Sequence, residues 1–216
     1  MVRLWEESLK SQGWRLDDVE ALNVLARFDG NPLFALLRAR GLDPEGKPML
    51  PYVLVRGEAA VVVPECVNRE TGARKLLMVR QRRLGDGSLS LEFPAGMVEN
   101  GGDPAETALR ELEEETGLDS ALIRSVKLER LWQRGLSSSP GLTDESVHFF
   151  FVEVPLDDAR FHALEGGEAG HQDEHEHITT TLKTSAEAFP EVGSMLALLG
   201  LFLYQQRLRQ TGGRPA

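Results

Sequence analysis

Cysteine is almost absent from this sequence: Cys66 is the single one among 216 residues. One cysteine forms neither a disulfide framework nor a thiolate metal site, and this scarcity is typical of proteins from a reducing compartment. No run of 18 apolar residues occurs, and the opening "MVRLWEESLK" lacks the apolar centre of a secretory signal. We therefore expect a cytoplasmic protein with no membrane partner.

Basic residues are also scarce relative to acidic ones, with 24 Lys and Arg against 34 Asp and Glu, so the formal net charge is −10. This balance argues against nucleic acid as a partner, because binding to its backbone needs a basic surface. It leaves room for a small anionic substrate, since a bound divalent cation can reverse the local charge. With 41% hydrophobic residues, the chain has the composition of an ordinary globular domain, alone or with a small appendage.

The first 50 residues suggest a helical N-terminal segment. The apolar residues of "DDVEALNVLARF" recur at a spacing of three to four. The following "NPLFALLRARG" places Asn31 as an N-cap and Pro32 at the first helical position. We therefore predict helices in residues 1–50 and consider this segment a candidate for dimerisation.

From residue 51 onward the pattern changes to short β-rich runs around one strong helix. The runs are "YVLVRG", "AAVVVPE", "KLLMVRQRR", "SLSLEF", "SVKLERLWQR", "SVHFFFVEV" and "EHITTTL". The helix is "GDPAETALRELEEETGL", with Asp103 as its N-cap and Gly117 as its stop. A long apolar helix, "SMLALLGLFLYQQRLRQ", follows. Strands with helices on either side predict an α/β (α+β) sandwich over 51–210, followed by a loose tail at 211–216.

The acidic helix crowds like charges together. Glu111, Glu114 and Glu115 fall on one face, because residues three and four apart are neighbours on a helix. Either this face is simply solvated, or a cation lies among the carboxylates. The glycine-rich "EFPAGMVENGGD" before the helix allows close backbone approach to an ion. Carboxylate and carbonyl oxygens together suit Mg²⁺ or Mn²⁺.

The stretch "GMVENGGDPAETALRELEEETGL" resembles the Nudix box, G-x5-E-x7-R-E-U-x-E-E-x-G-U with U aliphatic. Eight positions match: Gly96, Arg110, Glu111, Leu112, Glu114, Glu115, Gly117 and Leu118. The first Glu of the box is replaced by Gly102. In the family that Glu is mainly thought to hold loop and helix together through the box arginine. The departure therefore bears on the rigidity of the loop more than on metal binding.

This resemblance implies a Nudix-type α/β/α sandwich with a mixed sheet. It also implies that Glu111, Glu114 and Glu115 bind Mg²⁺ or Mn²⁺, with the Ala95 carbonyl as a further ligand. Glu115 and Arg110 are the box residues that we assign to catalysis, and we expect Gly96 beside the substrate. The bound cations polarise a diphosphate and activate a water.

Sequences flanking the box resemble the ADP-ribose and ADP-sugar diphosphatases. In "LLMVRQRR", Arg80 and Arg82 are candidate substrate contacts, since arginine suits phosphate; a solubility patch on an edge strand is the alternative. In "SSSPGLTDESVHFFF", Pro140 and Gly141 match the Ser-Pro-Gly loop of that subfamily, and Thr143 and Glu145 match the Thr-acidic-Glu sequence that follows it. An ordinary hairpin loop is the alternative there.

A later stretch, "GHQDEHEHITT", resembles the mobile loop in which these enzymes keep a Glu-x-Glu before a strand. Glu174 and Glu176 fit this spacing, and Glu174 is the preferred general base. Three histidines in the same stretch show no recognised zinc spacing beyond their own cluster, so we interpret them as loop residues.

Together these features predict metal-dependent hydrolysis of ADP-ribose or an ADP-sugar to AMP and a sugar phosphate, with a nucleotide sugar as substrate. The resemblance also implies a homodimer. One alternative is a Nudix hydrolase for another nucleoside-diphosphate-linked compound, a dinucleotide or a nucleoside triphosphate. Another is a module that senses ADP-ribose without cleaving it, which the Gly102 departure keeps open.

Overall fold

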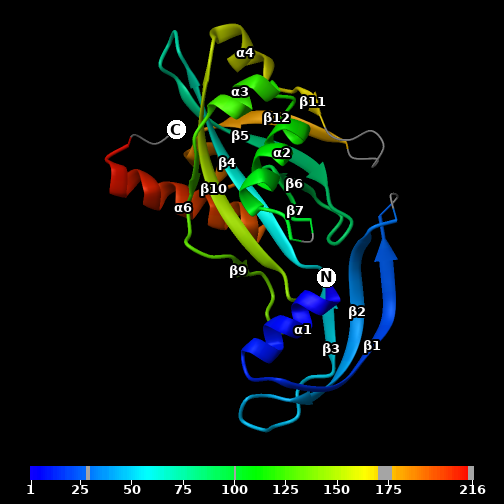
Figure 1. Cartoon of the computed structure of the whole chain (residues 1–216). Coiled ribbons are helices and arrows are strands. Elements are labelled where there is room, and N and C mark those ends of the chain that lie inside the picture. The colour runs from blue at the N-terminus through cyan, green and yellow to red at the C-terminus, as the bar shows by residue number, and fades with distance from the viewer. Residues whose placement is uncertain (28–29, 100, 170–176, 214–216) are drawn as a thin grey trace. The chain divides into compact units, whose positions relative to one another are not determined.

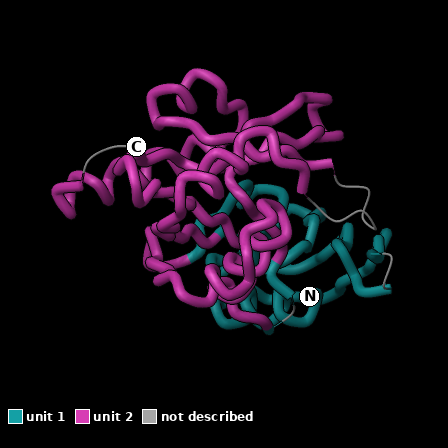
Figure 2. The backbone as a smooth tube through the Cα atoms, turned by 90° about the horizontal axis from the view of Figure 1, so that it is seen from above, with its two compact units in different colours: residues 1–59, 98–101, 135–147 teal, residues 60–97, 102–134, 148–216 magenta. Residues whose placement is uncertain are grey.

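The computed structural model describes residues 1–27, 30–99, 101–169 and 177–213. The chain divides into two compact units, coloured separately in Figure 2. The first unit takes residues 1–59, 98–101 and 135–147, and the second takes 60–97, 102–134 and 148–216. The first unit is therefore built from three separate stretches of the chain.

The first unit packs one helix on a three-stranded antiparallel sheet. The helix is α1 (Val2–Ser11), and the sheet has the order β1 (Arg15–Ala26), β2 (Pro32–Leu42), β3 (Tyr52–Val55). Alternate residues of β2 point into the core, since successive side chains of a strand project from opposite faces. The buried residues of this core are Trp5, Ala35, Leu37, Ala39 and Val55.

The prediction that residues 1–50 are helical is wrong beyond α1. The two segments expected as helices form the β1–β2 hairpin, and Asn31 lies in its turn, where its carbonyl accepts a hydrogen bond from Arg27 N–H at 2.7 Å. Register shifts interrupt the pairing of β1 with β2 at three places, one of them between Ala21 and Asn23. Such bulges break the alternation of a strand, so the remaining apolar spacing resembles that of a helix. Pro32 begins β2, a position that proline tolerates.

A nine-stranded sheet, most of it in the second unit, forms the larger layer. Its main path is β11-β12-β5-β4-β10-β8, while β6, β7 and β9 pair with β5, β4 and β10 (Figure 1). The strands are β4 (Glu58–Asn68), β5 (Arg74–Arg82), β6 (Leu89–Glu92), β7 (Ala95–Met97), β8 (Leu128–Arg130), β9 (Leu136–Ser137), β10 (Ser146–Leu156), β11 (Glu168–Ala169) and β12 (Ile178–Lys183). All of the strands predicted after residue 51 are present, although "YVLVRG" forms β3 in the sheet of the first unit and β8 covers only part of "SVKLERLWQR".

Helices cover both faces of this sheet. They are α2 (Pro104–Thr116), α3 (Ser120–Ser125), α4 (Asp158–Ala163), α5 (Ser185–Ala188) and α6 (Met195–Thr211). Figure 1 shows α2 on one face and α6 on the other. The predicted α/β/α sandwich is therefore confirmed. The tail predicted at 211–216 starts one residue too early, because α6 extends through Thr211 and is capped by Gly212 in a left-handed conformation; residues 214–216 lie outside the described part.

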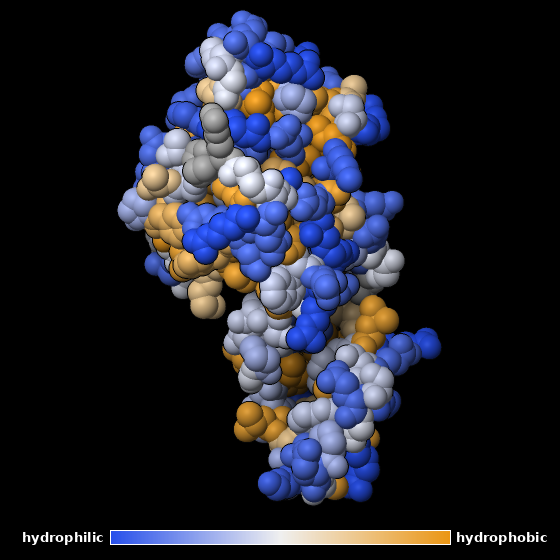
Figure 3. All heavy atoms as spheres, turned by 90° about the vertical axis from the view of Figure 1, so that its left-hand side faces the viewer, coloured by the Kyte–Doolittle hydropathy of each residue, from blue (hydrophilic) through white to orange (hydrophobic). Residues whose placement is uncertain are grey.

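The interior of the second unit is apolar, with fully buried residues on β4, β5, β10 and α6. Some large apolar side chains reach the surface as well, among them Met195 and Phe202 of α6. Figure 3 shows hydrophobic residues interspersed with hydrophilic ones on one face. Within the described residues, no helix combines the length and the apolar character needed to cross a membrane.

Candidate functional site

Helix α2 holds the acidic residues in a fixed register. The Asp103 carboxylate accepts a hydrogen bond from Ala105 N–H at 2.8 Å, and Pro104 occupies the first turn. At the other end, Gly117 adopts a left-handed φ of 67° and donates to the Glu113 carbonyl at 2.9 Å. These are ordinary helix caps. They set where the helix begins and ends, and so place the acidic residues at defined positions along it.

Strand β7 lies against two of these carboxylates. Glu115 is 6% exposed, and its Oε2 accepts a hydrogen bond from Ala95 N–H at 3.2 Å. A Cβ built on Gly96 would overlap the Glu111 carboxylate and lie 2.8 Å from its Cγ. Glycine is therefore required at position 96 for Glu111 to approach the backbone so closely.

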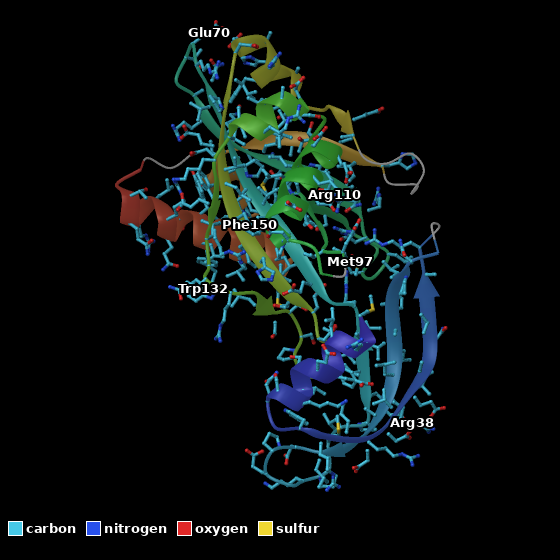
Figure 4. The ribbon with its side chains drawn as sticks, viewed as in Figure 1. Arg38, Glu70, Met97, Arg110, Trp132 and Phe150 are labelled. Carbon is cyan, nitrogen blue, oxygen red and sulfur yellow. The ribbon has the colours of Figure 1, made fainter. Side chains whose placement is uncertain are left out.

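Arg110 bridges two carboxylates of the same helix. Its Nη2 lies 2.6 Å from Glu111 Oε1, and its Nη1 lies 2.5 Å from Glu114 Oε2. Burial alone would lower the pKa of Arg110, but the two ion pairs outweigh it, so the pKa is raised. Figure 4 labels Arg110 on α2 and Met97 at the end of β7. The arginine thus stays charged and keeps both carboxylates in place.

The cluster has the chemistry of a site for a hard divalent cation. Three carboxylates outnumber the single guanidinium among them, and crowded carboxylates in a half-buried setting favour a cation. Oxygen donors of this kind suit Mg²⁺ or Mn²⁺. Within the described ranges, no three His, Cys, Asp or Glu side chains are already gathered around one ion position. The donor set fits the expected group by its chemistry, although Arg110 pairs with two of its carboxylates.

The candidate substrate residues of β5 face away from α2. Arg80 and Arg82 share a face of the strand with Leu76, because they are separated by even intervals. Leu76 pairs with Glu65, whose carboxylate accepts a hydrogen bond from the Tyr204 hydroxyl of α6. The two arginines therefore project from the face that α6 covers. The structure does not bring them together with the box carboxylates, and their substrate role stays a prediction.

Arg80 is also engaged by a carboxylate that the sequence did not connect with it. Its Nη2 forms an ion pair with Glu191, and the other oxygen of Glu191 contacts Lys183 Nζ at 2.8 Å. These contacts lower the pKa of the Glu191 carboxyl, with the Lys183 hydrogen bond as the larger cause. A substrate phosphate at Arg80 would have to compete with this carboxylate.

Sequence reasoning missed a polar group on the opposite face, close to β7. Glu92 forms an ion pair with Arg83, at 2.8 Å from Nη2 and 3.0 Å from Nε. Burial would raise the pKa of Glu92, but Arg83 and Ser90 lower it more. In β5, Gln81 lies opposite Ser90 and is 6% exposed, and its Oε1 finds no partner among the described residues. The polar residues of "SLSLEF", directly before the box, were the available signal.

The predicted loop residues Pro140 and Glu145 lie in the first unit. Glu145 is 9% exposed, and its carboxylate contacts Arg56 Nε at 3.1 Å and Ser138 Oγ at 2.5 Å. The Glu145 backbone N–H donates to Thr143 Oγ1 at 3.1 Å. Glu145 is thus an ordered carboxylate beside an arginine, which an exposed hairpin loop would not require. Its role toward a substrate stays a prediction.

The candidate bases Glu174 and Glu176 lie outside the described residues, as do two of the three neighbouring histidines. Strand β12 begins directly after this stretch, at Ile178, as the sequence predicts. The assignment of a general base therefore rests on the sequence.

The Nudix domain model matches residues 57–184. The chain is similar to a methanol dehydrogenase activator of Bacillus methanolicus (38% identity; 46% of this chain and 48% of the relative). It is also similar to an ADP-ribose pyrophosphatase of Bacillus subtilis strain 168 (40% identity; 38% and 41%). An ADP-sugar pyrophosphatase of Mus musculus is 35% identical over 55% of this chain and 54% of its own length. The chain thus spans about half the length of these curated relatives.

A solved structure supports the fold over nearly the whole chain. The crystal structure of an ADP compounds hydrolase superimposes with a TM-score of 0.61 and covers 93% of this chain and 97% of its own. Its sequence is only 20% identical, so this likeness establishes the fold alone.

Proposed function

Because this chain belongs to the Nudix family, we propose that it hydrolyses the diphosphate bond of ADP-ribose or an ADP-sugar, giving AMP and a sugar phosphate. The observation that carries the proposal is the packing of Glu111 and Glu115 of α2 against Gly96 and Ala95 of β7. Two relatives, the ADP-ribose pyrophosphatase of Bacillus subtilis and the ADP-sugar pyrophosphatase of Mus musculus, support the choice of substrate class.

Glu111, Glu114 and Glu115 hold Mg²⁺ or Mn²⁺ in this proposal, with the Ala95 carbonyl as a further ligand. When bound, the cation neutralises the diphosphate and lowers the pKa of a water. The chain itself supplies the positions: Ala95 N–H holds Glu115, and Arg110 holds the other two carboxylates. Their spacing along the chain is set by the helix and by the strand, and cation binding would draw Glu111 and Glu114 away from Arg110.

In the reaction, a water oxygen forms a bond to one phosphorus as the bridging P–O bond breaks. Glu174, or its neighbour Glu176, accepts the proton of the water. Arg80, Arg82, Pro140, Glu145 and Gly96 are the proposed substrate contacts. Glu145 carries the best structural support among them, because a nearly buried carboxylate beside Arg56 suits recognition of polar substrate groups.

We further propose a cytoplasmic homodimer that binds neither nucleic acid nor membranes. Cys66 is free and buried, which fits a reducing compartment. The net charge of −10 disfavours a polyanionic partner. Exposed apolar residues on the hairpin of the first unit, such as Leu22, Val24 and Leu25, support a protein contact there.

The direct test is product analysis with ADP-ribose, ADP-glucose, UDP-glucose, GDP-mannose, NADH and dATP, each with Mg²⁺ and then with a chelator. We expect chelator-sensitive AMP release from ADP-ribose or ADP-glucose. Turnover of another compound alone would keep the metal site and discard the substrate assignment. Tight ADP-ribose binding without turnover of any compound would establish a sensor instead.

A further inference from the structure

Gly200 stands in the middle of α6, where glycine weakens a helix. Packing explains its presence. A Cβ on Gly200 would lie 2.8 Å from Phe93 Cδ2, 2.9 Å from Phe93 Cε2 and 3.4 Å from Val63 Cγ2. Phe93 is 2% exposed and Val63 is fully buried. The missing side chain of Gly200 therefore lets the Phe93 ring lie directly on the helix backbone.

Phe93 is close in sequence to Ala95 and Gly96, the two residues that contact the box carboxylates Glu115 and Glu111. The next residue, Pro94, has a restricted φ, and its carbonyl accepts a hydrogen bond from Val62 N–H of β4 at 3.0 Å. Ala95 follows, and its N–H donates to Glu115 at 3.2 Å. Each of the three residues Phe93, Pro94 and Ala95 thus makes a contact that fixes its position.

This arrangement connects the two faces of the sheet through consecutive residues. Phe93 is clamped on the α6 side, and Ala95 and Gly96 contact Glu115 and Glu111 on the α2 side. A shift of the ring by a few tenths of an ångström has to be absorbed by the Pro94–Gly96 backbone, because protein interiors are close-packed.

We propose that the Gly200–Phe93 contact is a positioning device that fixes β7 against α2 and so sets the affinity of the box carboxylates for a divalent cation. Gly200 and Phe93 touch neither cation nor substrate and act through Ala95 and Gly96. This inference rests on the proposed function only in the identity of the cation site.

The test uses the full chain with Gly200→Ala, Phe93→Leu and the double variant. Leu208→Ala serves as control, since Leu208 is a buried residue of the same helix, more than two turns after Gly200, and lies beside Gly213. Mn²⁺ binding is measured by electron paramagnetic resonance, exchange of the Ala95 amide by NMR, and folding by thermal unfolding. None of these readouts requires turnover.

We expect each single variant to bind Mn²⁺ about tenfold more weakly, the usual effect of removing support behind a metal ligand. The Ala95 amide exchanges faster in both. The double variant recovers most of the lost affinity, because the alanine methyl fills space that the ring has left. Leu208→Ala lowers the unfolding temperature and leaves Mn²⁺ binding unchanged. Phe93→Leu tests the contact even if Gly200→Ala does not fold.

Unchanged Mn²⁺ affinity in a folded Gly200→Ala or Phe93→Leu protein would overturn this inference and leave the proposed metal site intact. Equal weakening by Leu208→Ala would do the same, since the effect would then follow from lost stability. A wild-type protein that binds no Mn²⁺ would overturn the proposed metal site together with this inference. The two failures are therefore distinguishable.

Discussion

Two arginine–carboxylate clusters lie on opposite faces of the sheet in the second unit, and they are built differently. On the α6 face, Glu65 is fully buried, with one oxygen 2.5 Å from Arg74 Nη2 and the other 2.5 Å from the Tyr204 hydroxyl. Arg74 also pairs with Glu153. The hydrogen bond with Glu65 is the largest cause that raises the pKa of Arg74. On the α2 face, one arginine serves two carboxylates beside a third.

The difference separates a structural cluster from the proposed cation-binding cluster on α2. Both Glu65 oxygens have strong donors, and the carboxylate is closed off from water, so further ligands have no access. The α2 cluster keeps more carboxylate than guanidinium and borders β7, whose backbone can contribute oxygens. Identical residue types therefore serve packing on one face and, in our proposal, ligand binding on the other, depending on the charge ratio and on access.

The largest expected effect is on the binding cluster. Glu115→Gln should lower turnover of ADP-ribose about a thousandfold, equivalent to roughly 4 kcal/mol of transition-state stabilisation. The amide keeps the shape of the side chain but removes the charge for the cation. Steady-state kinetics at saturating Mg²⁺ measures this, with thermal unfolding as the check on folding.

Glu113→Gln is the matched control for that variant. Glu113 lies on the same helix but accepts its hydrogen bond from the Ser120 hydroxyl, away from the cluster. We expect activity near that of the wild type. If Glu115→Gln remained as active as this control, the metal assignment would be wrong.

The structural cluster should respond in the opposite way. Arg74→Met leaves the buried Glu65 carboxylate without its cation, and we expect a loss of about 3 kcal/mol in the free energy of unfolding. The folded protein should keep its Mn²⁺ affinity. Urea unfolding and Mn²⁺ titration together measure the contrast, and a large loss of affinity would show that the two clusters are not independent.

A smaller effect is expected from Tyr204→Phe. This change removes one hydrogen bond to the charged Glu65 and preserves the ring, so the loss should be about 2 kcal/mol. Urea unfolding measures it. A variant as stable as the wild type would mean that Arg74 alone satisfies Glu65.

The smallest effect concerns acid stability and involves the Glu92–Arg83 ion pair, which belongs to neither cluster. The folded-state pKa of the Glu92 carboxyl is lowered from the usual 4.5, so its ionised form stabilises the folded protein at pH values above 4.5. This contribution is lost as the pH falls through the lower folded-state pKa. Glu92→Gln should therefore destabilise the protein at neutral pH and flatten the fall in stability below about pH 4.5. Unfolding curves measured from pH 3 to 7, at steps of about one pH unit, check this. An unchanged slope of stability against pH in the variant would contradict it.

The helix of the binding cluster was predictable because all of its signals are local. Asp103, Pro104 and Gly117 lie within or beside the helix they delimit, and the carboxylate spacing follows from its period. The β1–β2 hairpin could not be predicted in the same way. Bulges such as the one between Ala21 and Asn23 break the alternation of side chains between the two faces of a strand.

Contacts distant in sequence were equally out of reach. The pairing of Arg80 with Glu191, and the role of Gly200 beneath Phe93, join residues more than a hundred positions apart. No local pattern indicates such partners. The general base also stays a prediction, because Glu174 and Glu176 lie outside the described residues.

The division of the first unit into three stretches has a consequence for biosynthesis. Leu54 N–H donates to the Leu142 carbonyl at 2.8 Å, and Arg56 pairs with Glu145. Leu142 and Glu145 leave the ribosome more than 80 residues after the first stretch ends at Ala59, a delay of roughly 4 to 17 s at ordinary rates of synthesis. The N-terminal unit is thus the first to be started and cannot be completed until the whole box region has been made. Until then the β1–β2 hairpin exposes apolar residues. Slower translation before residue 147 therefore prolongs the time during which chaperones and proteases can reach it.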